Sequence, residues 1–199
     1  MSEKKEKTIE VKTIPLNLNE IKITVVGKSP LVMGKMSEET KKGILDKQTG
    51  ITKGNKKKVR DIEKESTEAI HKTNDGTIGF PFHGFKAGMM DVTSFIGDKF
   101  FSRKLVSGAV QITNVVDGLI PIKFKKQDIL EHFINPNTLF SPQFHEWSCE
   151  LEICYDANNI SAQDIMNLLN HAGHYVGVGM WRPKGKDGGS GIYGMYYVK

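Results

Sequence analysis

The segment from Gly173 to Val198 brings glycines, aromatic rings and positive charge together near the end of the sequence. Its glycines free the backbone to approach a phosphate or a base closely. Its rings can stack on bases, and its basic side chains can pair with phosphates. This pattern is typical of contact with single-stranded nucleic acid, and the alternative is a flexible hairpin with a solvated basic tip. The candidate binding residues here are Gly177, Gly179, Trp181, Arg182, Lys184, Lys186 and Tyr193.

A second basic stretch lies between Lys41 and Arg60, where eight Lys or Arg residues accompany one acidic residue, Asp46. A basic finger around Gly54 would neutralise several phosphates and make binding sensitive to salt, because each contact releases counterions. The alternative is a solvated loop. The candidate phosphate-binding residues of this stretch are Lys53, Lys56, Lys57, Lys58 and Arg60.

A third candidate site is the stretch from Gly79 to Val92, where Gly84 and Lys86 stand at the start of an expected helix. Free N–H groups and the helix dipole favour an anion such as phosphate at that position. Phe82 adds a ring that could stack on a base. The alternative is that the apolar residues of this stretch belong to the core and that Lys86 is an ordinary surface lysine.

Catalytic motifs are scarce in this chain. The six histidines are scattered, and although His171 and His174 are three residues apart, no nearby carboxylate completes a metal set, so we expect no metal and no cofactor. A ribonuclease that uses the 2′-OH of its substrate as nucleophile needs only a base and a cation. His83 with Lys86 is the candidate pair for such metal-independent cleavage.

Composition sets the remaining limits. The chain has 199 residues, 38% hydrophobic content and a formal net charge of +5, which predicts a single core and a modest preference for anionic partners. The charged N-terminus lacks an apolar stretch, and no segment approaches the length of a membrane span, so we expect a cytoplasmic protein. Cys149 and Cys154 fall on opposite faces of an expected strand, which predicts two free thiols.

Hydrophobic periodicity indicates an α+β chain. Alternation predicts strands over 21–25 and 147–155, and a hairpin formed by 110–115 and 119–122. Residues 123–142 have a mixed pattern and no assigned element. The last strand pair is expected at 175–181 and 192–198.

Helical spacing predicts a core helix from Gly84 to about Gly97. Ser161 and Asp164 resemble a capping box that opens a second core helix, which Gly173 would end. Within an inserted, mobile basic arm at 33–75, we expect a short helix capped by Ser37 and another over 59–71.

This order of elements predicts the split βαβ, ferredoxin-like plan: an antiparallel sheet with helices on one face, whose open face or rim can hold single-stranded nucleic acid. Residues 1–19 would form a flexible N-terminal segment. Residues 20–199 would then form one domain that carries the inserted basic arm at 33–75.

Three features in order resemble the RAMP superfamily of CRISPR proteins, which are RNA-recognition-like domains whose backbone subunits polymerise along a guide RNA. They are Ser29-Pro30-Leu31 after the first strand, Gly79-Phe80-Pro81 with Gly84-Phe85-Lys86-Ala87, and the terminal Gly-rich segment. The chain is also similar to a family of bacteriophage proteins that share PLVMGKxSE, GFPxxGFKAxMxD and GVGxWRP blocks over most of 20–198. That similarity implies a phage or prophage origin and a bacterial host cell.

The resemblance implies that Gly84 and Lys86 lie beside bound nucleic acid and that Gly177 and Gly179 belong to the superfamily's Gly-rich loop. It also implies that the arm over 41–60 corresponds to a thumb-like insertion. The Gly-rich spacer is longer than the family's, and no Asp follows the first strand where the subunits that cut target RNA carry their cleaving aspartate.

The leading hypothesis is therefore a non-catalytic protein that binds single-stranded DNA or RNA and assembles along the strand as a homo-oligomer or filament. A metal-independent endoribonuclease built around His83 is the enzymatic alternative. The third hypothesis is a phage interaction protein that targets a component of host defence. No sequence feature separates DNA from RNA, because every contact invoked is to a phosphate or a base face.

Overall fold

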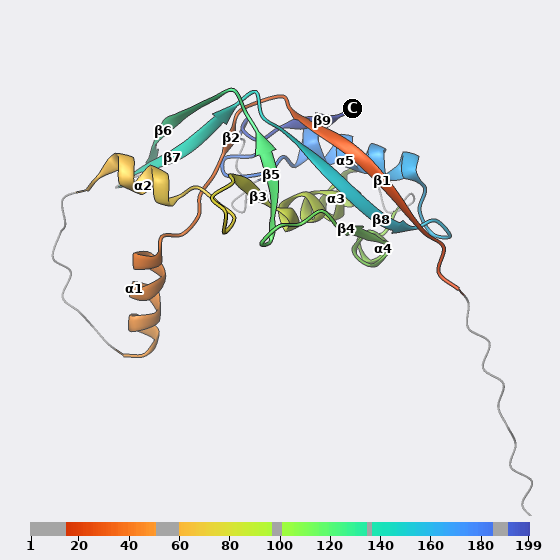
Figure 1. Cartoon of the computed structure of the whole chain (residues 1–199), viewed down its shortest axis with the longest axis horizontal. Helices are drawn as coiled ribbons and strands as arrows, with labels where there is room; N and C mark the ends of the chain where they lie inside the picture. The colour runs from red at the N-terminus through yellow and green to blue at the C-terminus, as the bar shows by residue number, and fades with distance from the viewer. Residues whose placement is uncertain (1–14, 51–59, 97–100, 135–136, 185–190) are drawn as a thin grey trace, which may run out of the picture.

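The computed structural model describes residues 15–50, 60–96, 101–134, 137–184 and 191–199. Its larger sheet has the strand order β3-β5-β8-β1-β9, with β4 also paired to β8, and all its pairings are antiparallel (Figure 1). The strands are β1 (Leu18–Gly27), β3 (Gly79–Pro81), β4 (Val110–Ile112), β5 (Leu119–Lys123), β8 (Ser148–Asp156) and β9 (Tyr196–Val198).

This order confirms the split βαβ plan. β1 and β5 belong to the first βαβ unit and are separated by β8, while β8 and β9 belong to the second and are separated by β1. Each unit is thus split by a strand of the other. The crossing helices are α3 (Phe82–Ile96) and α5 (Ala162–Tyr175), followed in the first unit by the short α4 (Arg103–Ala109).

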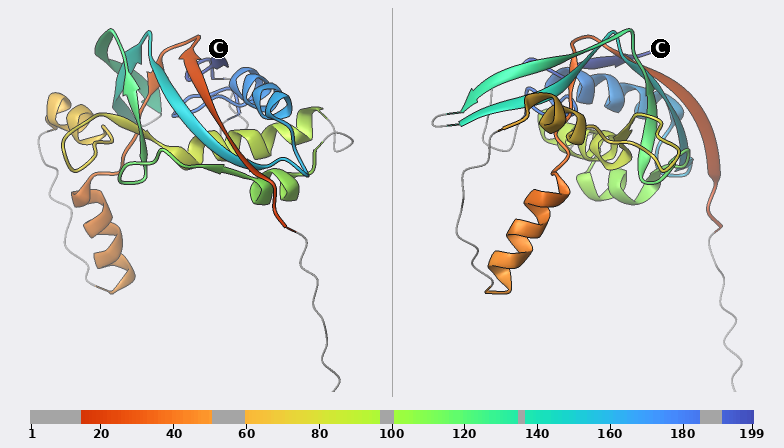
Figure 2. Two further views of the ribbon diagram at one scale, coloured as in Figure 1. Left: turned by 45° about the vertical axis from the view of Figure 1, so that its right-hand side comes forward. Right: turned by 60° about the vertical axis from the view of Figure 1, so that its left-hand side comes forward.

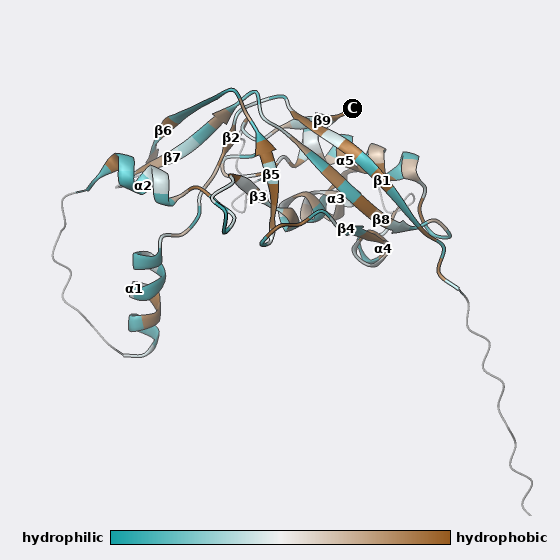
Figure 3. Cartoon of the chain, in the orientation of Figure 1, coloured by the Kyte–Doolittle hydropathy of each residue, from teal (hydrophilic) through white to brown (hydrophobic). Residues whose placement is uncertain are grey.

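Helices α3 and α5 contact each other and cover one face of the larger sheet (Figures 1 and 2). Alternating residues explain this arrangement: Ile23, Val25, Leu151 and Ile153 point into the core, and polar residues between them point away. Figure 3 shows the alternation as bands along β1 and β8. In α5, the capping box between Ser161 and its N3 residue is present as predicted.

A second sheet, which the sequence pattern did not predict, contains β2 (Leu31–Val32), β6 (Lys126–Ile134) and β7 (Asn137–His145) in the order β2-β7-β6. β6 and β7 form a long hairpin that projects from the larger sheet (Figure 1). One face of this hairpin carries polar residues, among them Asp128, Gln143 and His145, which bond to each other. In β6, Leu130 shares a face with His132, and Glu131 shares the other face with Phe133, so the apolar alternation that marks a half-buried strand is absent.

The arm contains the two expected helices. α1 (Glu38–Gln48) is capped by Ser37, has no buried residue and projects from the body (Figure 2). α2 (Ile62–Glu68) lies against β7, where Arg60 donates a hydrogen bond of 2.7 Å to the carbonyl oxygen of Thr138. The predicted mobility of 51–59 and of 1–14 concerns parts of the chain outside the described residues.

Three predicted details are wrong. β4 and β5 do not pair with each other as a hairpin, although Asp117 and Gly118 form the expected tight turn between them; both strands pair with β8. Gly173 does not cap α5, which continues to Tyr175; a Cβ on Gly173 would lie 2.1 Å from the carbonyl oxygen of Tyr196 in β9. The glycine is there so that helix and strand can pack closely.

The third wrong detail is the terminal strand pair. In the described part of 175–181 and 191–199, only Tyr196–Val198 is a strand, while Tyr175 ends α5 and Gly177 adopts φ +67°. Positive φ interrupts an extended strand, which explains why alternation over 175–181 indicated the wrong element.

Both cysteines are free thiols, as predicted. Burial raises the pKa of the Cys149 thiol to about 12. In the part of the chain that the structure describes, no helix has the length and apolar character required to span a bilayer.

Candidate nucleic-acid interface

The terminal glycine-rich segment forms a layer of closely packed backbone. Val178 N–H donates to the carbonyl oxygen of Gly194, Tyr193 N–H donates to that of Trp181, and Met180 N–H donates to that of Val32 in β2. A Cβ on Gly179, which has φ +82°, would lie 2.5 Å from that same Val32 oxygen. Segments 177–181 and 191–195 are thereby held together and fixed to the chain that follows β1.

The chain's own backbone thus approaches Gly177 and Gly179. A Cβ on Gly177 would lie 2.9 Å from Pro183 Cδ and 3.2 Å from the carbonyl oxygen of Gly194. These contacts account for both glycines as packing residues. The phosphate or base expected beside them remains a prediction.

Trp181 is the focus of this layer. It has φ +57°, a left-handed conformation that is uncommon for a bulky residue. Its indole stacks on the imidazole of His132 in β6, with 3.7 Å between ring centroids and 25° between ring planes. Its Nε1 is buried and has no hydrogen-bond acceptor among the described residues. Strained backbone and an unsatisfied buried donor at one residue are features that cluster at functional sites.

The basic residues after Trp181 are held by local contacts. Arg182 Nε donates to the carbonyl oxygen of Lys184 at 2.9 Å. The ammonium of Lys184 lies 5.0 Å from the ring centroid of Phe95 and 4.0 Å from a carboxylate oxygen of Asp91. Tyr193 is half-buried in the packed layer. Lys186 lies outside the described residues.

The arm meets the glycine-rich layer at a hollow of about 760 Å³, which is lined by Lys35, Arg60, Lys64 and Met180, among others. Arg60 is already engaged: its guanidinium donates to both carboxylate oxygens of Glu65 and lies over the ring of Phe140. The four lysines predicted to bind phosphate, Lys53, Lys56, Lys57 and Lys58, fall outside the described residues. The described part of the arm and Met180, the residue before Trp181, therefore line the same hollow.

At the start of α3, Gly84 packs against the ring of Phe80: a Cβ on Gly84 would lie 2.6 Å from Phe80 Cε1. In the same stretch, the N–H of Phe82 donates to the carbonyl oxygen of Gly118. His83 is exposed and Lys86 is half-buried. This stretch is well packed, and the anion expected there remains a prediction.

A neighbouring histidine, His71, is a candidate that no sequence pattern predicted. It is half-buried, and its burial, followed by the nearby charges of Lys35, His83 and Lys41, lowers its pKa. The chain thus brings two histidines and two lysines of the arm and of α3 into one electrostatic neighbourhood. No sequence spacing links His71 to His83, because the contact is tertiary.

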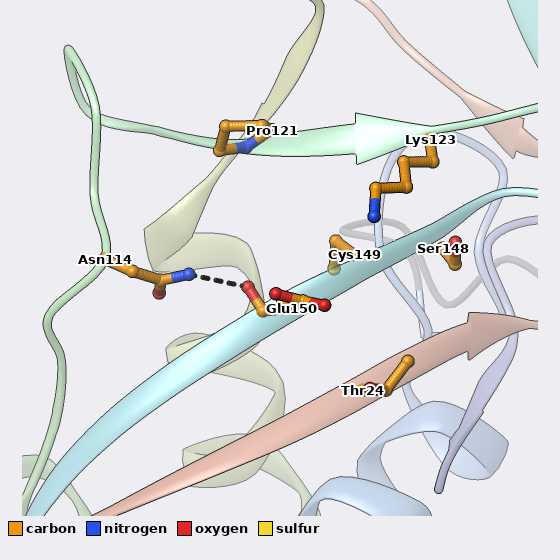
Figure 4. Close-up of a pocket in the computed structure, with 7 residues that line it drawn as sticks. All are labelled: Thr24, Asn114, Pro121, Lys123, Ser148, Cys149 and Glu150. Carbon is orange, nitrogen blue, oxygen red and sulfur yellow. Dashed lines mark hydrogen bonds between the residues drawn. The ribbon is translucent and has the colours of Figure 1, made fainter.

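The open face of the larger sheet has little to offer an anion. In the described residues its carboxylates, Glu20, Glu150 and Glu152, outnumber its amines, and Lys22 is ion-paired with both Glu150 and Glu152. A shallow pocket of about 200 Å³ on this face contains Lys123 on one side and Glu150 on the other (Figure 4). The hydrogen bond from Lys22 lowers the pKa of the Glu150 carboxyl, so this face keeps its negative charge.

His132 is a second residue without a sequence prediction, since it lies in the stretch over 123–142 whose mixed pattern indicated no element. The available signal was weak: β6 contains Leu130 and Phe133 but also charged residues. Only the fold places this histidine on Trp181.

Two solved structures resemble this chain distantly in fold. The crystal structure of Cmr6 from Pyrococcus furiosus matches with a TM-score of 0.41 and 12% identity, covering 93% of this chain and all of that one. A Cas6 product complex matches with a TM-score of 0.27 and 13% identity over 89% of this chain and 50% of that one. At this similarity neither neighbour specifies a function. No protein-family model and no curated protein matches the chain.

Proposed function

We propose that this chain binds single-stranded nucleic acid through the surface around Trp181. The observation that supports this proposal most directly is the stack of Trp181 on His132. Trp181 has a strained backbone, and its buried indole N–H lacks an acceptor among the described residues. A buried donor without a partner costs about 1–3 kcal/mol. Arg182 and Lys184 follow it directly and supply charge for phosphates.

The charge distribution supports this location over the open sheet face. On that face the described lysines are balanced or outnumbered by carboxylates, whereas Lys28, Lys35 and Arg182 make no ion pair within the described residues. A strand of nucleic acid would therefore follow the glycine-rich layer past Lys28, Lys35 and Arg182. The hollow beside the arm is lined by the carboxylates Glu39, Asp61, Glu65 and Glu68 as well as by cations, so it is not part of this route. This route brings phosphates to the lysines of the arm while bases reach Trp181.

Cooperative assembly along the strand is a finer part of the proposal. α1 buries none of its residues, yet Ile44 and Leu45 are apolar and exposed. A helix with unpartnered apolar side chains can be covered by a neighbouring copy on the same strand. The resemblance to RAMP backbone subunits and to the bacteriophage family supports this assembly and a phage or prophage origin.

The test is fluorescence anisotropy with matched labelled single-stranded DNA, single-stranded RNA and duplex DNA at about 50 mM and about 200 mM salt. We expect salt-sensitive binding that prefers a single strand. Replacing Arg182 and Lys184 with Ala should weaken it and reduce the salt slope by about 0.7 for each phosphate that the variant no longer neutralises.

The matched control replaces Lys22 and Lys123, two lysines of the open sheet face, with Ala. It should leave affinity within about twofold of wild type. A larger drop in affinity in the control than in the Arg182/Lys184 variant would move the site to the open face, and no binding at low salt would refute the function and favour a protein partner.

A second candidate function is metal-independent RNA cleavage by His83 and Lys86, to which the electrostatic interaction of His71 with His83 adds a second candidate base. A lowered pKa keeps His71 neutral at neutral pH and able to accept a proton, while Lys35 and Lys41 can hold the phosphate. Labelled RNA should then be cut in EDTA, and His83→Ala and His71→Ala should each abolish cutting. RNA that is bound but not cut would refute the cleavage hypothesis and leave the binding function.

A further inference from the structure

A row of aromatic rings lies on the surface where α3 and α5 meet. Tyr175 at the end of α5 stacks on Phe95 of α3, with 5.5 Å between ring centroids and 7° between planes. Tyr175 also stacks on His171, with 6.1 Å between ring centroids and 13° between ring planes. His174 meets Tyr175 edge-on at 4.9 Å. Three nearly parallel rings from two helices thus form a row with Tyr175 in the middle.

The rings of this row are exposed, although their size and stacking would suit a core. Phe95 is 51% exposed and Tyr175 is 44% exposed, and His171 and His174 are exposed as well. Exposed apolar rings gathered in one place mark a binding surface more often than rings scattered singly. The row does not contribute to the described core, so its arrangement needs another explanation.

Positive charge lies at the Phe95 end of the row. The ammonium of Lys184 lies over Phe95, and Arg182 is tied to Lys184 through its backbone carbonyl. Arg103 of α4 lies on the same side, 2.5 Å from Asp91, which is the carboxylate that Lys184 approaches at 4.0 Å. Among the described residues, Arg103 and Lys184 thus share the carboxylate of Asp91, which leaves an excess of positive charge beside exposed rings, a combination that suits bases joined by phosphates.

We propose that the row His171–Tyr175–Phe95 is a second base-stacking subsite for the same strand of nucleic acid that Trp181 binds. The inference rests on the proposed function and extends it. Lys184 links the two subsites, because it follows Trp181 by three residues, a chain length of at most about 11 Å, and reaches Phe95 with its ammonium. A base that stacks on His171 would extend the row at one end, and the ammonium of Lys184 covers Phe95 at the other end.

A second copy of this chain is the competing occupant of the row, and the charge beside the row disfavours it there. A second copy of this chain carries a formal net charge of +5, so cations around the row would face a partner of like charge. Phosphates complement these cations, and stacking on a base is tolerant of base identity. The row therefore predicts binding of single strands with little sequence preference.

The test compares oligonucleotides of about four and about twelve nucleotides, in the anisotropy assay, on full-length variants. Tyr175→Ala removes the ring that supports His171 in the row, so the base stack on His171 should be lost. Affinity for the longer strand should fall by roughly 5- to 150-fold, the range expected for one base stack, and the shorter strand should be affected less. Tyr175→Phe keeps the ring and should bind like wild type. Tyr197→Ala, which removes an exposed ring from the open sheet face, is the matched control.

A second measurement reads occupancy directly. Photocrosslinking of a strand that contains 5-iodouracil, followed by mass spectrometry, should give adducts at His171 or Tyr175 as well as at Trp181. Phe95 and Tyr175 are exposed, so their replacement should leave the melting temperature unchanged.

The outcomes separate the two proposals. If wild type binds no strand of either length, the proposed function fails. If wild type binds and Trp181→Ala weakens it, but Tyr175→Ala binds the longer strand like wild type and no adduct forms on the row, the function stands and the second subsite is refuted. A change of oligomeric state in Tyr175→Ala with unchanged affinity would also overturn the inference, since it assigns the row to a second copy.

Discussion

Trp181 and His132 stack with 3.7 Å between their ring centroids, which joins the glycine-rich layer to the outer half of the projecting hairpin. The two residues are distant in sequence: His132 lies in β6, and Trp181 lies in the segment between α5 and β9. The stack fixes where a base can meet the layer, because the indole presents one side to the imidazole.

Emission from Trp181 should report on binding. The chain has two tryptophans, and Trp147 is fully buried with its Nε1 bonded to the carbonyl oxygen of Ser29, which shields it from ligand. Saturation with a single strand should change tryptophan fluorescence, and Trp181→Phe should abolish most of that change. A change that persists in this variant would mean that the ligand acts near Trp147.

Substitution of Gly179 should destabilise the fold. Gly179→Ala places a Cβ 2.5 Å from the Val32 oxygen at φ +82°, and left-handed backbone alone costs an L-residue about 1–2 kcal/mol. We expect the free energy of unfolding in urea to fall by more than that amount. Gly108→Ala is the matched control: it lies in α4 with open space around it and should gain about 0.5–1 kcal/mol. Equal stabilities of the two variants would contradict the packed layer.

The two thiols should differ in reactivity. Cys149 is buried and its pKa is raised to about 12, so almost no thiolate forms there in the native protein, whereas Cys154 is half-buried on the open face. Alkylation at mild alkaline pH should modify Cys154 first and Cys149 only after denaturation. Peptide mass spectrometry distinguishes them, and early labelling of Cys149 would show that β8 opens readily.

His71 should make stability depend on pH. Its folded-state pKa is lowered, mainly by burial and then by Lys35, so the unfolded chain takes up the proton more readily than the folded one. Its contribution to stability is therefore complete above its ordinary pKa of about 6.5 and declines as the pH falls below it.

Melting temperatures at about pH 5.5 and about pH 7.5 should differ less in His71→Gln than in wild type. His174→Gln, which changes an exposed histidine on α5, should keep the wild-type difference. An unchanged pH difference in His71→Gln would show that His71 titrates alike in both states.

Local signals predicted the elements that have local causes. Alternation in β8 and the capping box of α5 are read within one segment, and both were confirmed. The spacing of Phe85, Met89 and Val92 likewise predicted α3, because one apolar stripe faces the core. The element order then determined the split βαβ plan.

Tertiary causes left no such signal. The terminal segment contains alternating residues, yet Gly177 and Gly179 take positive φ to fit between β2 and segment 191–195. Both faces of β6 mix polar and apolar residues, so the hairpin of β6 and β7 lacks the alternating pattern of a half-buried strand. For the candidate site, the sequence predicted Trp181 but not His132 or His71, whose partners are contributed by the fold.

The hydrogen bond from Arg60 to the Thr138 carbonyl has a consequence for the association of whole molecules. Beyond its short pairing with β2, β7 presents an outer edge of backbone groups, and α2 with Arg60 covers that edge. An uncovered edge strand is a template for β-pairing with another chain. The arm thus covers this part of the β7 edge, and a version of the chain without 60–68 would expose it to pairing with another chain.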